Sequence, residues 1–152
     1  MQFSIKNIML FLVMLLHFGA HASSSEVKDD IGEFVKGAVE QYVSNGTDGI
    51  DKKWQMTIGV DKTPFLTSLK SIEGYYGRVV DYDIVNITSV SDRVSIAYVA
   101  LNYEKGAAFL RVQFYRTHEG EVTILYANVH TEAYKIMPSS LTVKPYYIKN
   151  KT

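Results

Sequence analysis

The chain has 152 residues, in which 16 Lys and Arg side chains balance 16 Asp and Glu side chains, and it contains no cysteine. Because nucleic-acid binding relies on a concentrated basic surface, this balance argues against a nucleic acid as partner. The lack of cysteine excludes disulfides. The length suits one domain with one hydrophobic core.

The first 22 residues have the pattern of an export signal. Lys6 supplies a positive charge, residues 8–16 are apolar, and Ala20-His21-Ala22 has the small-x-small form that signal peptidase cleaves. Because the apolar run is short for a bilayer span, we expect cleavage after Ala22 and no membrane anchor. The mature chain, beginning at Ser23, is then a periplasmic or secreted protein.

An amphipathic helix is predicted from Glu26 to Val43, followed by the stop signal Asn45-Gly46. Gly32 and Gly37 lower its helix propensity by about 1 kcal/mol each relative to alanine. We expect these two glycines to let the helix approach a sheet closely. The apolar positions recur every three or four residues, at Val27, Ile31, Phe34, Val35, Ala38, Val39, Tyr42 and Val43.

The segment from Thr47 to Thr63 fits a strand and a helix about equally well. We expect a loop with one short ordered piece, and Trp54 packed over one end of the core, because a lone aromatic is more often buried than used to stack a ligand. A second helix begins at Thr63-Pro64, since proline suits the first turn of a helix. It ends at Gly74 or Gly77.

Residues 79–131 form the region around which the rest of the chain is arranged. Four runs rich in Val, Ile, Tyr and Phe, separated by short turns, indicate an antiparallel meander. We place the strands at residues 78–89, 93–104, 107–117 and 121–131. The predicted α+β domain, residues 23–138, packs N-terminal helices on an antiparallel meander of about four strands. Residues 139–152 form a C-terminal tail, partly ordered at most.

Alternation along the strands separates two faces of this sheet. The aliphatic face should pack under the helices. Its predicted members are Ala97, Val99, Leu101, Ala108, Leu110, Val112, Phe114, Leu125, Ala127 and Val129. The other face, to which the alternation also assigns Ile124, holds fewer Lys, Glu and Thr than a solvated face would. We predict that it contacts a protein partner, a small apolar ligand or, in a homodimer, a second copy. The candidate binding residues are Tyr98, Arg111, Gln113, Tyr115, Tyr126, Asn128 and His130.

The order of elements resembles the nuclear transport factor two-like superfamily, in particular its small exported members of uncharacterised function. The resemblance lies in the run from Ser68 to Gly77, which leads into the first long strand, and in the run from Leu125 to Thr131 before Ile136-Met137-Pro138. It implies a strongly bent, cone-like sheet around helices, a pocket at the open end and frequent dimers. A cystatin-like fold, with one long helix across an antiparallel sheet, is the alternative.

Catalytic, metal and cofactor motifs are lacking. The resemblance implies that Asp81 or Asp83 with Tyr98 would imitate the carboxylate and tyrosine of ketosteroid isomerase-like members. A solvated strand edge is the simpler interpretation of both aspartates. His118 lies in a predicted turn, and a lone histidine at a strand end, such as His130, is more often at the surface than in an acid–base pair. No ligand spacing indicates a metal, and no cofactor is predicted.

We therefore predict an exported, non-catalytic binding module that uses the sheet face or a pocket between helix and sheet. Fold alone does not decide this, because the superfamily includes isomerases, dehydratases and hydrolases as well as binding modules. One alternative is an isomerase- or dehydratase-type enzyme with an Asp/His–Tyr pocket. The other is an accessory component of an envelope assembly.

Overall fold

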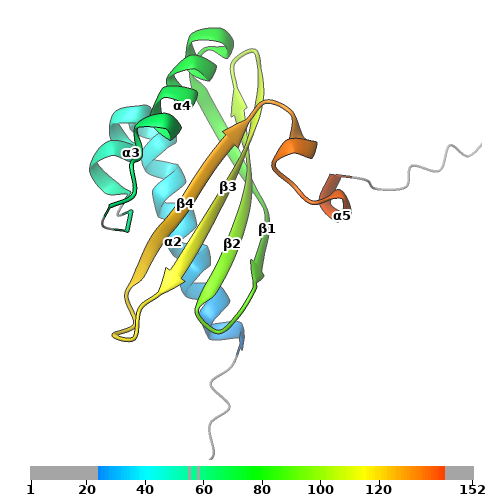
Figure 1. Cartoon of the computed structure of the whole chain (residues 1–152). Helices are drawn as coiled ribbons and strands as arrows, with labels where there is room; N and C mark the ends of the chain where they lie inside the picture. The colour runs from blue at the N-terminus through cyan, green and yellow to red at the C-terminus, as the bar shows by residue number, and fades with distance from the viewer. Residues whose placement is uncertain (1–23, 55, 58, 143–152) are drawn as a thin grey trace, which may run out of the picture.

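A four-stranded antiparallel sheet forms the centre of the protein (Figure 1). The computed structural model describes residues 24–54, 56–57 and 59–142, without the side chains of residues 24–30 and 51–53. In this part of the chain, helices come first and the strands follow, in the same order in the sheet as in the sequence. The protein is therefore of the α+β class, and the predicted meander is confirmed.

The element boundaries agree closely with those expected. The helices before the sheet are α2 (Ser24–Asn45), α3 (Thr47–Lys53) and α4 (Thr63–Tyr76). The strands are β1 (Val79–Ser89), β2 (Val94–Tyr103), β3 (Gly106–Arg116) and β4 (Val122–His130), each end within one residue of its predicted position. After β4 come the 3-10 turn η2 (Ala133–Lys135) and the one-turn helix α5 (Ser139–Thr142). The agreement reflects long runs of β-branched and aromatic residues between clear turn residues.

α2 lies behind the sheet in Figure 1 and buries one stripe of side chains against it. Its members Ile31, Val35, Val39 and Tyr42 follow the spacing of a helical face and are at most 2% exposed. They join one core cluster with buried residues of α4 and of the sheet. Burial of this stripe stabilises the long helix despite its two glycines.

The close approach predicted at Gly32 and Gly37 is wrong. A Cβ at Gly37 would meet no atom within 4 Å, and one at Gly32 would come only into ordinary contact with Ile87. The tight contact is instead at Gly49 of α3, where a Cβ would collide with the backbone carbonyl of Gln41 on α2. Glycine at this position lets the short helix pack directly on the backbone of the long one.

The segment that fitted two structures forms α3 and then one isolated bridge between Met56 and Ile124. Trp54, directly after α3, is 5% exposed. Its Nε1 donates to the Ala38 carbonyl at 3.3 Å, and its ring centroid lies 5.4 Å from that of Phe65. The predicted short ordered piece and the predicted burial of Trp54 are both confirmed.

α4 begins and ends with the help of specific residues. Thr63 is its first residue, and the backbone N–H of Thr63 donates to Asp61 Oδ1 at 2.9 Å. The helix ends before Gly77, whose φ of 84° favours glycine, and the Gly77 N–H donates to the Glu73 carbonyl. Of the two predicted stops Gly74 and Gly77, the second is therefore correct.

The core lies between the helices and one face of the sheet. On β2 and β3 the residues of this face alternate as predicted, and each is at most 2% exposed: Ala97, Val99, Leu101, Ala108, Leu110, Val112 and Phe114. On β1 the alternation is interrupted by register shifts between Val79 and Asp81 and between Ile84 and Asn86. These bulges add a residue to the strand and change the face of those that follow.

β4 departs from the predicted alternation for the same reason. Gln113 pairs with Tyr126 but Phe114 pairs with Ile124, so Leu125 is an extra residue in the ladder. The assignment of Ile124 to the second face was therefore wrong, because Ile124 is 0% exposed in the core. The assignment of Leu125 to the aliphatic face fails together with it, since a bulge shifts a two-residue period by one position.

Candidate functional site

The seven predicted binding residues share the outer face of the sheet, the face turned away from the core. The register pairs Tyr98 with Arg111 and Arg111 with Asn128. Because directly paired residues lie on the same face, these three form one row across the sheet. Neighbouring rows on that face pair Gln113 with Tyr126, Tyr115 with Thr123, and Phe109 with His130.

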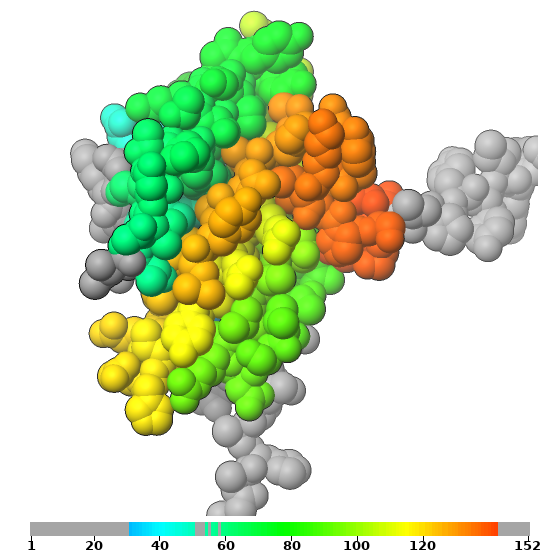
Figure 2. All heavy atoms as spheres, viewed as in Figure 1, coloured from blue at the N-terminus to red at the C-terminus, as the bar shows by residue number. Residues whose placement is uncertain are grey.

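Part of this face is covered by the C-terminal segment, which we define as residues 131–142 and which is orange to red in Figure 2. Ile136 and Met137 are 5% and 6% exposed, and they form a second buried cluster with Tyr98, which is 9% exposed. Partly buried residues packed against this cluster are Ile96, Phe109 and Leu141. The C-terminal segment therefore buries these apolar residues of the outer face within the chain itself.

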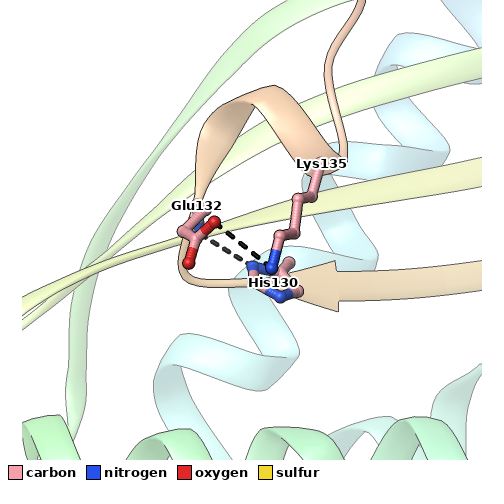
Figure 3. A network of polar contacts seen from close by, with 3 residues as sticks. All are labelled: His130, Glu132 and Lys135. Carbon is pink, nitrogen blue, oxygen red and sulfur yellow. Dashed lines mark hydrogen bonds and ion pairs between the residues drawn. The ribbon is translucent and has the colours of Figure 1, made fainter.

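His130 holds the beginning of the C-terminal segment (Figure 3). Its Nδ1 accepts a hydrogen bond of 2.9 Å from the backbone N–H of Glu132. Lys135 Nζ lies 3.3 Å from Glu132 Oε2, and hydrogen bonds from Tyr134 and Lys135 lower the pKa of the Glu132 carboxyl. Within the described residues, His130 thus fixes a turn of its own chain.

The rest of the outer face remains accessible, and Figure 2 shows it towards the viewer below the C-terminal segment. Tyr126 is 47% exposed. We call this region the open patch; it consists of one exposed tyrosine, one exposed amide and three half-buried side chains, namely Tyr126, Asn128, Arg111, Gln113 and Tyr115. Of the seven predicted residues, the structure leaves these five available to a partner.

Arg111 lies in the middle of the open patch. Its Nε is shielded from solvent and has no hydrogen-bond partner among the described residues. Within the described part of the chain, Arg111 forms no hydrogen bond or ring contact with its two neighbours in the ladder, Tyr98 and Asn128. A buried N–H donor without an acceptor is unfavourable by roughly 1–3 kcal/mol. A partner that binds this side chain therefore has to use its terminal N–H groups, because Nε is shielded.

The structure does not bring the candidate catalytic residues together. Asp81 and Asp83 are exposed on β1, which forms one edge of the sheet. His118 lies in the turn after β3, where its Nδ1 is 3.2 Å from the Arg93 guanidinium. His130 contacts Glu132, as described above. Among the described residues, no group of three His, Cys, Asp or Glu is placed to hold a metal ion.

A cavity of about 590 Å³ lies where α2 and α4 end and β1 begins, a place that the sequence did not indicate. Its charged lining residues are Glu73, Arg78 and Glu104. Two glycines of the lining, Gly46 and Gly77, have φ values of 62° and 84°. Such glycines mark the chain reversals that bring separate elements together, and they are the sequence signal that was available. The volume falls in the range of small-molecule sites.

A buried pair of tyrosines lies next to Glu73. Tyr42 Oη and Tyr103 Oη are 2.9 Å apart, and the two residues are 1% and 5% exposed. Burial raises the pKa of both hydroxyls, that of Tyr103 to about 12. The hydrogen bond to Tyr103 and the charge of Glu73 raise the pKa of Tyr42 further. Both hydroxyls therefore stay protonated at neutral pH and hold α2 against β2.

The tyrosine pair predicts a loss of stability at alkaline pH. Because the folded-state pKa exceeds the value of about 10 in an unfolded chain, the pair contributes its full stability below about pH 10. That contribution is lost as the pH rises through the folded-state pKa, which is about 12 for Tyr103. In urea titrations, Tyr42→Phe should reduce this dependence of the unfolding free energy. The control Tyr75→Phe changes a tyrosine that is 78% exposed, and it should retain the wild-type profile. Equal profiles for all three proteins would refute this role of the pair.

Comparison of the chain with protein-family models, with curated proteins and with solved structures finds no match. No helix in the described part of the chain is long and apolar enough to span a membrane. The function proposed next therefore rests on the geometry and chemistry of this chain itself.

Proposed function

We propose that this protein is an exported, non-catalytic binding module that captures a protein partner through the open patch. The observation that carries the proposal is a contrast within one sheet face. Ile136 and Met137 cover one part of the outer face, whereas Tyr126 and Asn128 remain exposed in the other part. Tyrosine and arginine are enriched in protein interfaces, where they combine large contact area with directed hydrogen bonds.

The charge of the open patch favours a different protein over a second copy. The patch contains one cationic group, Arg111, and no carboxylate. A symmetric dimer would place the same patch on both sides of the interface, so neither copy would supply an acid from this patch. A partner with an acidic group would complement the patch better. Self-association remains a distinct outcome of the experiment below.

The cavity supports a second candidate function, a small-molecule site of the isomerase or dehydratase kind. Glu73 lines this cavity and acts on the pKa of Tyr42 through its charge and a hydrogen bond. A carboxylate beside a tyrosine is the combination that enolate chemistry uses. We rank this candidate second because neither Tyr42 nor Tyr103 is among the lining residues, and the predicted Asp81, Asp83 and His130 lie elsewhere.

The order of elements supports a relationship to the nuclear transport factor two-like superfamily more than to the cystatin-like alternative. α4 packs on β3 and β4 in addition to α2 on β1, whereas a cystatin-like fold has one long helix across its sheet.

Export is inferred from the signal-like sequence of residues 1–22, which lies outside the described residues. An accessory role in an envelope assembly is one setting in which such a module would work.

Tyr126→Glu and Tyr115→Glu should each weaken partner binding by about tenfold or more, because a charge would replace an aromatic contact. Tyr126 is 47% exposed, so Tyr126→Glu should change the unfolding free energy by only about 0.5 kcal/mol. The partner is first cross-linked in an extract of the producing cells and identified by mass spectrometry. Its affinity for the wild-type protein and the variants is then measured with the purified proteins.

Tyr134→Glu is the matched control. Tyr134 is 70% exposed on η2, outside the open patch, and its variant should bind the partner as the wild type does. Sedimentation velocity of the protein alone tests whether a second copy occupies the open patch. A dimer that Tyr126→Glu dissociates would identify a second copy as the occupant. If both glutamate variants keep the wild-type affinity and sedimentation, the open patch is not the binding site.

A further inference from the structure

We propose that the partner presents a carboxylate, from an Asp or Glu side chain, to the guanidinium of Arg111. This inference rests on the proposed function and specifies the chemistry of the partner. It follows from the place of Arg111 as the one cationic group of the open patch, half-buried and without an acid paired to it among the described residues. Free small carboxylates share this chemistry, so the experiment compares them with a peptide.

Arg111 has one neighbour on each of the two adjacent strands. On one side it pairs with Tyr98 of β2, which is 9% exposed under the C-terminal segment. On the other side it pairs with the exposed Asn128 of β4. Arg111 therefore lies between one covered and one accessible neighbour. Its Nε is shielded from solvent, so a partner that approaches from the side of Asn128 contacts the terminal N–H groups of the half-buried side chain.

A carboxylate fits this donor better than a neutral acceptor does. The guanidinium presents two terminal N–H groups side by side, and a carboxylate accepts both in parallel. Among the described residues, no acid is paired with Arg111, and Asp81 and Asp83 lie at the β1 edge of the sheet. Where water is excluded, such a charge-assisted pair is stronger than at an exposed surface.

The tyrosines of the open patch indicate what should flank the acid. Tyr126 pairs with Gln113, in the row next to that of Arg111, and Tyr115 lies one row further along β3. Their rings offer apolar surface on one side of the guanidinium. The matching segment thus carries an acidic residue with an apolar neighbour, a combination that a short peptide reproduces.

The Nε–H of Arg111 serves as the reporter, observed by NMR of the full-length, nitrogen-labelled protein. Its resonance is assigned by its loss in Arg111→Lys. Three probes are titrated: a synthetic peptide with glutamates flanking leucine, the same peptide with glutamines, and sodium acetate. We expect a saturable shift with the glutamate peptide and binding at least about tenfold weaker for the glutamine peptide and for acetate. An adventitious anion effect would instead give equal shifts with acetate and peptide.

Variants test the same inference by affinity. Arg111→Leu and Arg111→Lys should weaken binding of the glutamate peptide by about 10- to 100-fold and by a smaller factor, respectively. Arg78→Leu, which removes an arginine at the cavity, should leave it unchanged. The inference is overturned if glutamate and glutamine peptides bind alike, if acetate binds as well as the glutamate peptide, or if the Nε–H resonance does not move.

The two proposals can fail separately. If Tyr126→Glu loses the purified partner while Arg111→Leu and Arg111→Lys bind it as the wild type does, the carboxylate contact is wrong and the open patch stands. If Tyr115→Glu and Tyr126→Glu both bind the partner normally, the proposed function fails, whatever the arginine variants do. Because Arg111→Lys keeps the charge and most of the stem, it also covers the case in which Arg111→Leu does not fold.

Discussion

Phe114→Ala is expected to lower the free energy of unfolding by about 3–5 kcal/mol, the range for removing a buried aromatic ring. Phe114 is 1% exposed, and its ring contacts that of Phe34 edge to face, with centroids 5.7 Å apart. It therefore joins β3 to α2 through the middle of the core. Since a domain of this size is stable by only about 5–15 kcal/mol, the variant should be close to unfolding at room temperature.

Urea denaturation monitored by circular dichroism measures this effect. Phe114→Leu, which retains part of the buried volume, should lose less stability than Phe114→Ala. Tyr134→Ala removes a ring that is 70% exposed and should change the unfolding free energy by about 0.5 kcal/mol at most. A loss below about 1 kcal/mol for Phe114→Ala would show that the site collapses around the smaller side chain, contrary to the packing described here.

Two glycine-to-alanine substitutions should have opposite signs. In the interior of a helix, alanine is usually favoured over glycine by about 0.5–1 kcal/mol. Gly37→Ala on α2 should realise this gain, because a Cβ there meets no atom within 4 Å. Gly49→Ala should instead lose about 1–3 kcal/mol, because its Cβ would collide with the Gln41 carbonyl and push α3 away from α2.

Thermal unfolding of the two variants beside the wild type measures the difference. The midpoint should rise for Gly37→Ala and fall for Gly49→Ala. Both substitutions add the same methyl group to a helix, so the gain in helix propensity is the same for both. The difference between the two midpoints therefore reports how closely α3 packs on α2. Two shifts of the same sign would mean that α3 does not rest on the backbone of α2.

The strand positions could be predicted because hydrophobic alternation is a local property of the sequence. On β2 and β3 the ladder is regular, and the face assignments hold from Ala97 to Phe114. On β1 the bulged residues Val80 and Val85 are 55% and 39% exposed, so no single alternation runs through the whole strand. Leu125 causes the same failure on β4. A bulge depends on pairing with another strand, so the alternation of one strand does not reveal it.

The candidate site was predicted in part for the same reason. The outer-face residues could be grouped from alternation, but the burial of Tyr98 depends on Ile136 and Met137, which lie in a segment without periodic pattern. The cavity beside Glu73 depends on where two helices end in space. These are tertiary contacts, and the sequence signals for them are single residues rather than repeating ones.

Both edges of the sheet are protected, and this directs association to its face. β1 carries two bulges together with the exposed charges of Asp81 and Asp83. The edge of β4 is partly occupied, since Met56 bridges to Ile124 and the Thr57 N–H donates to the Ile124 carbonyl at 2.9 Å. Bulged, charged or covered edges are poor templates for an added strand. The protein can therefore expose an aromatic surface for recognition while resisting the edge-to-edge stacking from which amyloid-like aggregates grow.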